Sequence, residues 1–447
     1  MINKLKPIIF KAWQHKGLRL YGANTLWLFA EKAVRMLIGF VVGIYVARQL
    51  GPEKYGLLNY AISFVMLFAC FSELGLNGIV VRELVKGSKA AGKLLGTAAI
   101  LKFIGFLIMM LCISVALFGI NEKLDNKILI FVIAGGFLFQ SLQVIEFFFQ
   151  AKVLSKYSAI AQILTILILS VCRVYLAYNQ FPLIYFAALE TLNMLLTIVF
   201  CLFFYILSGN RILKWRFDKA CALFLLKESW PVMFSSGATI IHMQIDRVML
   251  KNMASPAEVG CYSFAARIAN LWYFVPVILG TSLFPAIVAS RKISISLYYL
   301  RLRRLMAFVI WFAVFIALFL TISASFIIWL TGGEQYSGSV IILQLLSWSL
   351  ILVFFGSIRR QWLLAEGLQK HILICSITGA VVNIFLNYLL IPSYGGIGSA
   401  ISTFIAFVFT FLIVPLFLKK SSINNMLFWQ SFYNFKNLIY SKDTEEI

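Results

Sequence analysis

Charged and amide side chains interrupt the long apolar stretches of this sequence at helical spacing. Glu31 and Arg35 stand four residues apart, so they would share one face of a helix, and Lys32 lies beside them. Farther along the chain, a polar stripe is formed by Gln143, Glu146 and Gln150, which lie within about 60° of helical rotation of one another. Gln140 lies beside this stripe. A charged side chain at the centre of a bilayer costs about 2.5–3.5 kcal/mol. Such residues should therefore face a hydrated cavity or pair with one another.

Other charges and amides also fall within apolar stretches, namely Asn59, Glu73, Lys102, Arg173, Glu190, Asp246, Arg247, Arg267 and Asn270. Several have a purely structural alternative. Glu31 and Arg35 could form a salt bridge that only fixes helix orientation, and Arg173 and Arg247 could extend to the membrane surface. The glutamine-rich stripe could hydrogen-bond to neighbouring helices. Arg267 lies deeper in its stretch, which favours a cavity-lining position for it.

The composition predicts an all-α polytopic membrane protein. The 447 residues are 62% hydrophobic and 13% charged, with a mean hydropathy of +0.92, whereas soluble domains contain about a quarter charged residues. The apolar stretches are too long and too uniform for barrel strands, so we expect helices. At about 20 residues per crossing, we expect about twelve spans, near 24–47, 56–80, 94–118, 128–150, 157–178, 182–207, 229–250, 259–288, 305–330, 338–364, 371–391 and 396–418.

The positive charge predicts the topology of these spans. The formal net charge is +22, and its Lys and Arg residues gather on alternate predicted loops, which is the positive-inside pattern. Both termini should therefore be cytoplasmic, and the excess charge should contact anionic lipid rather than nucleic acid. The predicted regions are a basic cytoplasmic N-terminus (1–23), an N-terminal lobe of six spans (24–208), a cytoplasmic linker (209–228), a C-terminal lobe of six spans (229–418) and a cytoplasmic or interfacial tail (419–447).

An internal repeat supports the division into two lobes. The segment ARQLGPEKYGLLNY, residues 47–60, matches residues 251–264 at an offset of 204, so that Pro52 aligns with Pro256 and Gly56 with Gly260. A second match, between residues 150–157 and 364–371, has an offset of 214. Two parallel halves of six helices are typical of transporters whose site lies between the repeats. We therefore expect two pseudo-symmetric lobes around a central cavity.

One segment resembles a known family. Residues 24–64, NTLWLFAEKAVRMLIGFVVGIYVARQLGPEKYGLLNYAISF, continue through FSELGLNGIVVREL at 71–84. They resemble the N-terminal signature of bacterial polysaccharide transporters of the Wzx type, the O-antigen flippases. Their superfamily, called MOP, also contains MATE-type multidrug exporters and the peptidoglycan-precursor flippase. The resemblance implies a transporter, not an enzyme, of the bacterial inner membrane.

The resemblance also implies a substrate and a mechanism. Such a protein moves an undecaprenyl-pyrophosphate-linked oligosaccharide from the cytoplasmic to the outer leaflet by alternating access, alongside a polysaccharide polymerase and other assembly proteins. The cations expected to meet the pyrophosphate are Arg35, Arg267, Lys32 and Arg247. The amides available to a sugar are Asn59, Gln140, Gln143 and Asn270. Net transport could be coupled to a proton or sodium gradient, for which the candidates are Glu31, Glu73, Glu146 and Asp246, or simply to consumption of the flipped product.

Two other functions are alternatives. A MATE-type exporter of small cations shares the fold but favours an anionic cavity, which Arg267 disfavours. A polysaccharide polymerase needs an extracytoplasmic platform, whereas the predicted outer loops have about ten residues or fewer. The sequence has no Walker A motif, no spacing typical of metal ligands and no recognisable cofactor motif. Its seven cysteines are scattered singly, so we interpret them as apolar filling.

Overall fold

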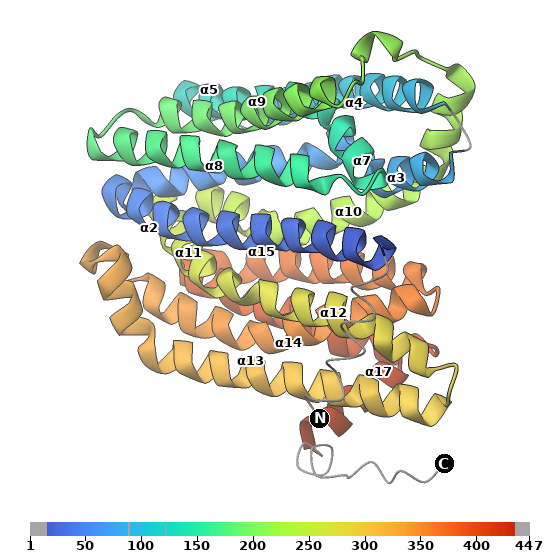
Figure 1. Ribbon diagram of the computed structural model, residues 1–447. Coiled ribbons are helices and arrows are strands. Elements are labelled where there is room, and N and C mark those ends of the chain that lie inside the picture. The colour runs from blue at the N-terminus through green and yellow to red at the C-terminus, as the bar shows by residue number, and fades with distance from the viewer. Residues whose placement is uncertain (1–15, 88–89, 121, 434–447) are drawn as a thin grey trace. The chain divides into compact units, whose positions relative to one another are not determined.

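The protein is helical throughout the residues that its computed structural model describes, which are 16–87, 90–120 and 122–433 (Figure 1). Within these ranges there is no strand. The first fifteen residues of the predicted N-terminus and the last fourteen of the predicted tail lie outside the described residues. The all-α fold class predicted from composition is confirmed.

Nine helical stretches of the described chain are long and apolar enough to cross a membrane by length and composition. They are Asn24–Lys86, Ala91–Gly119, Leu124–Ala151, Ser155–Tyr178, Leu183–Leu207, Pro256–Ser290, Ile295–Gly332, Ser339–Ala365 and Gln369–Leu416. Two of them contain a glycine that breaks the helix, Gly51 (φ 72°) and Gly395 (φ 52°). Each of these two stretches therefore supplies two helices, as the predicted spans at 24–47 and 56–80 and at 371–391 and 396–418 require. The predicted seventh span lies within the more polar α10 (Lys219–Met253).

The described chain divides into two compact units. The first consists of residues up to Gln49 together with Phe64–Gly237, and the second of Leu50–Ser63 together with the chain from Ala238 onward. Besides its parts of α2 (Lys16–Glu73) and α10, the first unit contains α3 (Asn77–Lys86), α4 (Ala91–Gly119), α5 (Leu124–Gly135), α6 (Phe137–Gln140), η1 (Ser141–Gln143), α7 (Val144–Ala151), α8 (Ser155–Tyr178), α9 (Leu183–Leu207) and η2 (Ile212–Lys214).

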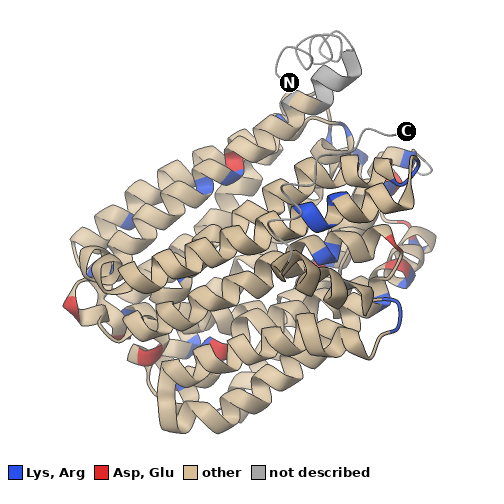
Figure 2. Cartoon of the chain, turned by 90° about the horizontal axis from the view of Figure 1, so that it is seen from below, with Lys and Arg blue, Asp and Glu red and all other residues tan. Residues whose placement is uncertain are grey.

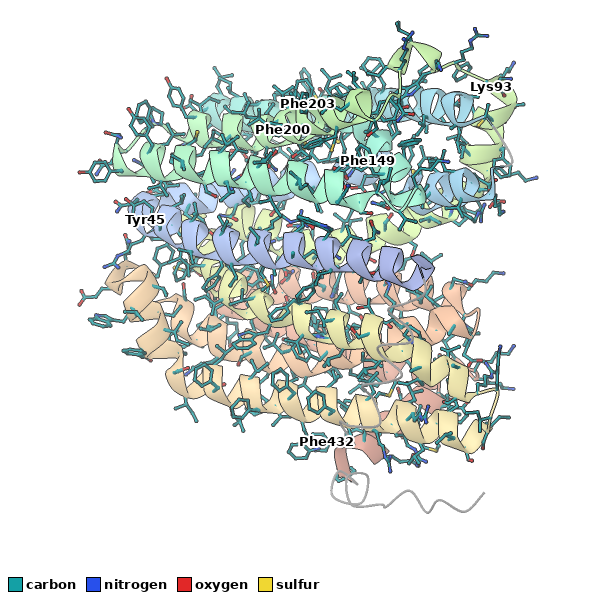
Figure 3. All side chains as sticks on the ribbon, viewed as in Figure 1. Tyr45, Lys93, Phe149, Phe200, Phe203 and Phe432 are labelled. Carbon is teal, nitrogen blue, oxygen red and sulfur yellow. The ribbon has the colours of Figure 1, made fainter. Side chains whose placement is uncertain are left out.

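Apolar packing holds the first unit together. Helices α8 and α9 pack side by side, and α5 packs on α9 (Figure 1). Phe149 is fully buried in the core of this unit, and Phe200 packs against the same core (Figure 3). Cys201 and Cys221 are also buried in it, in agreement with their interpretation as apolar filling. Most of each helix is apolar or neutral, so red and blue segments are sparse (Figure 2).

The predicted linker at 209–228 is fastened to the start of α4. Its Arg216 N–H donates to the Gly92 carbonyl at 3.2 Å, and its Asp218 N–H donates to Thr97 Oγ1 at 3.0 Å. The Asp218 carboxylate caps α10 by accepting from the Cys221 N–H at 2.8 Å. This hydrogen bond, helped by Lys93, holds the pKa of Asp218 below its usual value. Thus the segment that joins the two predicted lobes is ordered by α4.

The second unit adds to its parts of α2 and α10 the helices α11 (Pro256–Asn270), η3 (Leu271–Tyr273), α12 (Phe274–Ser290), α13 (Ile295–Gly332), η4 (Glu334–Tyr336), α14 (Ser339–Ala365), α15 (Gln369–Val408), the π-helix η5 (Phe409–Ile413), α16 (Val414–Leu416) and α17 (Ile423–Tyr433). Here α14 packs on α13, α15 and α11. The break in α15 is stabilised by Glu258 of α11, whose carboxylate accepts from the Gly396 N–H at 2.7 Å. A carboxylate at the start of a helical segment interacts favourably with its exposed N–H groups.

The two copies of the sequence repeat meet within this second unit. A Cβ added to Gly56 would lie 1.8 Å from the carbonyl oxygen of Pro256, and one added to Gly260 would lie 2.0 Å from that of Pro52. The contact is reciprocal, because each glycine of one copy faces the proline of the other. The offset of 204 residues therefore corresponds to a two-fold-like contact between two helix beginnings, and only glycine fits on either side.

We predict that Gly56→Ala and Gly260→Ala each destabilise the protein by about 1–3 kcal/mol or more, because a methyl group would overlap a backbone oxygen that cannot rotate away. Thermal unfolding of the purified protein in detergent measures this effect.

Gly78→Ala is the matched control, since a Cβ at Gly78 would meet nothing within 4 Å. Equal stability of all three variants would contradict the reciprocal contact.

Candidate substrate-binding site

A polar cavity lies within the first unit, where the predicted fourth span loses its regular helix. The short 3₁₀ segment η1 separates α6 from α7 at Ser141–Gln143, and such interruptions often mark functional positions. Beside it is a cavity of about 320 Å³. We call it the N-unit cavity, and it is lined by Arg35, Gln140, Gln143, Glu146, Gln162, Ile166, Arg173, Asn193, Met194, Thr197 and Ile198. Four of the predicted site residues are thus brought together.

A chain of polar contacts runs along one wall of this cavity. Lys102 is fully buried, and its Nζ donates to Gln143 Oε1 at 3.1 Å. The Nε2 of Gln143 contacts Glu146 Oε2 at 3.5 Å, and the Nε2 of Gln162 contacts Glu146 Oε1 at 3.4 Å. Because these last two contacts are long, amides hold the buried Glu146 carboxylate only weakly.

Two arginines that line the cavity each pair with a carboxylate. Arg35 Nε lies 2.9 Å from Glu31 Oε1, and Arg173 Nη2 donates to Glu190 Oε1 at 2.8 Å. The Glu31–Arg35 pair expected from their spacing is therefore formed, while Arg35 also lines the cavity. A guanidinium has five N–H donors in a planar fork, so each arginine can bind an oxyanion in addition to its carboxylate.

The other predicted cations lie outside this group. Lys32 is exposed on α2. In the second unit, Arg267 Nε donates to the hydroxyl of Tyr55 at 2.9 Å. Arg247 donates to Gln244 Oε1 at 2.7 Å and to Ser263 Oγ at 3.1 Å. The first unit and the second unit therefore each hold part of the predicted set.

The remaining predicted residues have simpler surroundings. Asn59 donates to the Tyr55 carbonyl of its own helix at 2.8 Å, which satisfies its amide locally. Asn270 is exposed at the end of α11. Glu73 ends α2 and is half-buried, and Gln140 accepts from Ser72 Oγ at 3.4 Å. Of the four predicted sugar-binding amides, only Gln140 and Gln143 line the N-unit cavity.

A second polar cluster surrounds Asp246 in the second unit. Its carboxylate is 2% exposed and accepts from Asn387 Nδ2 at 2.7 Å, Tyr262 OH at 2.7 Å and Thr403 Oγ1 at 2.9 Å. Asn383 lies next to Asn387, with 3.4 Å between its Oδ1 and the Asn387 Nδ2. Three neutral donors hold the carboxylate oxygens in fixed positions, so neighbouring side chains satisfy this buried acidic group.

Helical periodicity could have revealed several lining residues that we did not predict. Gln162 and Arg173 of α8 are eleven residues apart, which is about three turns, so they share a face. Asn193 and Thr197 of α9 are four residues apart and also share one. Arg173, which could have extended to the membrane surface, instead pairs with Glu190 and lines the cavity.

Several solved structures share this fold. The lipid II flippase MurJ in an inward closed conformation has a TM-score of 0.68 and is 16% identical, covering 93% of this chain and 95% of its own. An inward-facing MATE family multidrug resistance transporter of the MOP superfamily has a TM-score of 0.65 at 16% identity, covering 87% and 96%. A third structure is a MOP superfamily transporter from Pyrococcus furiosus that has a binding pocket of reverse polarity. Its TM-score is 0.61 at 16% identity, and the match covers 90% of this chain and 96% of that transporter. At these identities the likeness concerns the fold alone.

Sequence comparison identifies the family. A curated relative from Shigella dysenteriae, described as "Putative O-antigen transporter", is 24% identical over 407 residues, which cover 89% of this chain and 99% of the relative. Residues 21–291, more than half of the chain, match the family described as "Polysaccharide biosynthesis protein". The matched region includes the segment at 24–84 that carries the resemblance, α8 and α9 with the rest of the N-unit cavity, and Asp246. The chain belongs to the polysaccharide biosynthesis protein family.

Proposed function

We propose that this protein is a flippase for a lipid-linked polysaccharide repeat unit. It moves an undecaprenyl-pyrophosphate-linked oligosaccharide, such as an O-antigen unit, from the cytoplasmic to the outer leaflet of the bacterial inner membrane by alternating access. The observation that carries the proposal is the N-unit cavity, in which two arginines and several amides line one space. The family and the name of the Shigella relative support the same substrate class.

The chemistry of the cavity suits a charged headgroup. A pyrophosphate diester carries about two negative charges, and moving it through hydrocarbon without partners is prohibitive. Arg35 and Arg173 offer planar donor pairs that match phosphate oxygens. Their ion pairs with Glu31 and Glu190 hold the guanidinium groups in place before the substrate arrives. The polyprenyl chain stays in the lipid, so only the headgroup needs this path.

The sugar needs a different set of partners. Its hydroxyl groups both donate and accept hydrogen bonds, as amide side chains do. Gln140, Gln143, Gln162 and Asn193 present such groups along the N-unit cavity. The proposal keeps three further cations as candidate contacts for the pyrophosphate, namely Arg267, Arg247 and Lys32. It also keeps two further amides, Asn59 and Asn270, as candidate contacts for the sugar. A small-molecule exporter of cations would need the opposite charge at the N-unit cavity.

The direction of transport requires a driving force. Glu146 in the first unit and Asp246 in the second unit are buried carboxylates, and acidic side chains within membrane helices commonly mark ion or proton pathways. We include coupling to one of these gradients in the proposal, with Glu146 and Asp246 as the principal sites and Glu31 and Glu73 as the others. The positive-inside pattern supports a cytoplasmic position for both termini in this proposal.

We predict that Arg35→Ala and Arg173→Ala each lower the rate of transport about tenfold or more, because each removes a charge-assisted contact that contributes about 1.5–3 kcal/mol. Complementation of a flippase-null strain, with expression of each variant checked, measures the loss. Arg35→Lys and Arg173→Lys should restore only part of the activity, since lysine lacks the planar fork.

The matched control is Arg211→Ala, which removes an exposed arginine of the linker. Full activity of both cavity variants would exclude the N-unit cavity as the pyrophosphate path.

We also predict that Glu146→Gln or Asp246→Asn makes transport insensitive to the coupling gradient, because the amide is nearly isosteric but cannot change its charge. The measurement is translocation in proteoliposomes under an imposed proton or sodium gradient. If transport by the unaltered protein ignores both gradients, the coupling part of the proposal is excluded while the flippase assignment stands.

A further inference from the structure

A second cavity lies inside the second unit and is separate from the Asp246 cluster. Its volume is about 170 Å³, several times the roughly 30 Å³ that one water molecule occupies in the liquid. We call it the Arg359 cavity, and its walls include Val353, Leu363, Phe407 and Phe411 along with Arg359 itself. A buried arginine beside these apolar walls requires an explanation, because an isolated buried charge is costly.

Arg359 is 2% exposed and has only neutral partners. Its Nη1 donates to the Thr410 carbonyl at 3.2 Å, and its Nη2 donates to Cys375 Sγ at 3.4 Å. Its Nε is buried and has no hydrogen-bond partner. No ion pair recorded among the described residues includes Arg359. A buried guanidinium without a carboxylate is compensated only in part, so the cavity is complementary to an anion.

The backbone beside Arg359 also departs from regular geometry. Residues Phe409–Ile413 form a π-helix, and two of them, Thr410 and Phe411, line the cavity. The Thr410 carbonyl is the oxygen that accepts from Arg359. A single π-helical turn within a long helix is frequently found at a functional site. This second observation, independent of the charge, points to the same residues.

Further polar groups reach the cavity from other helices. His242 of α10 is buried, its ring lies edge-to-face against Phe407 at 4.8 Å, and neither ring nitrogen has a hydrogen-bond partner within standard geometry. The Ser376 side chain of α15 and the exposed Arg360 side chain of α14 line the same space. The cavity thus combines cationic and hydrogen-bonding groups with aromatic and aliphatic walls.

We propose that the Arg359 cavity binds the phosphate group of an amphiphile. The guanidinium of Arg359 faces the phosphate oxygens, and the apolar walls contact the chain attached to them. Phosphate is the anion that membrane amphiphiles carry, and basic pockets between membrane helices bind such headgroups. Two sources offer this chemistry, a membrane phospholipid and a polyprenyl phosphate. The proposal does not depend on the flippase assignment, because it concerns a different cavity.

The test uses the full-length protein, purified and stripped of lipid in a neutral detergent. Native mass spectrometry and thermal unfolding would measure binding of phosphatidylglycerol, polyprenyl phosphate, diacylglycerol and inorganic phosphate. We expect at least one of the two phosphate amphiphiles to bind and to raise the unfolding temperature, and diacylglycerol to bind at least about tenfold more weakly. Arg359→Gln should weaken binding about 10- to 100-fold, the effect of losing a charge-assisted contact.

A second variant guards against misfolding of the first. Ser376→Phe keeps Arg359 but fills the cavity, so this variant should no longer bind the amphiphile. The control is Arg301→Gln, which removes an exposed arginine of α13 and should bind the amphiphile as the unaltered protein does. Binding of polyprenyl phosphate alone would assign the site to that carrier, and binding of phosphatidylglycerol would assign it to membrane lipid. The proposal is overturned if Arg359→Gln and Ser376→Phe bind normally, if diacylglycerol binds equally well, or if only inorganic phosphate binds.

Discussion

A charge inside a membrane must be compensated, and the arrangement of polar residues in this protein follows from that constraint. Arg173 meets Glu190 and Arg35 meets Glu31 in the first unit, while amides hold Glu146. In the second unit, hydroxyl and amide donors hold Asp246. The proposed function depends on how complete this compensation is. Arginines that have one carboxylate each retain donors for a pyrophosphate, and the buried carboxylates of Glu146 and Asp246 are the candidates for binding a coupling ion.

Close backbone contact provides the frame for these groups. In the second unit, Gly56 and Gly260 let two helix beginnings approach until each touches the proline carbonyl of the other copy. A larger residue on either side would push α2 and α11 apart. Directly before Gly56, α2 also carries Tyr55, whose hydroxyl accepts a hydrogen bond from Arg267. The repeated Pro-x-x-x-Gly pattern is thus a packing motif, and it positions an intramembrane arginine as a consequence.

Sequence patterns predicted some parts of the structure and missed others for physical reasons. Mean hydropathy and span length were sufficient for the all-α membrane class, because hydrocarbon admits few other structures. The breaks at Gly51 and Gly395 followed from glycine and proline positions. Gln143 and Glu146 were recognised from their spacing on one helix. Gln162 and Asn193 were not, because a cavity wall combines several helices and spacing within one of them does not reveal its neighbours. Arg359 was not among the predicted site residues, since its burial depends on tertiary packing around α14 and the π-helix.

The most direct test of the central claim asks which leaflet holds the lipid-linked repeat unit in cells that lack this protein. The measurement is the accessibility of the undecaprenyl-linked oligosaccharide to a probe that cannot cross the inner membrane, in a deletion strain and in the same strain carrying the gene. We predict that without the protein the lipid-linked units accumulate in the cytoplasmic leaflet and stay inaccessible from outside, and that the gene restores access. Single units that still reach the outer leaflet in the deletion strain, with no other flippase for them, would contradict the account.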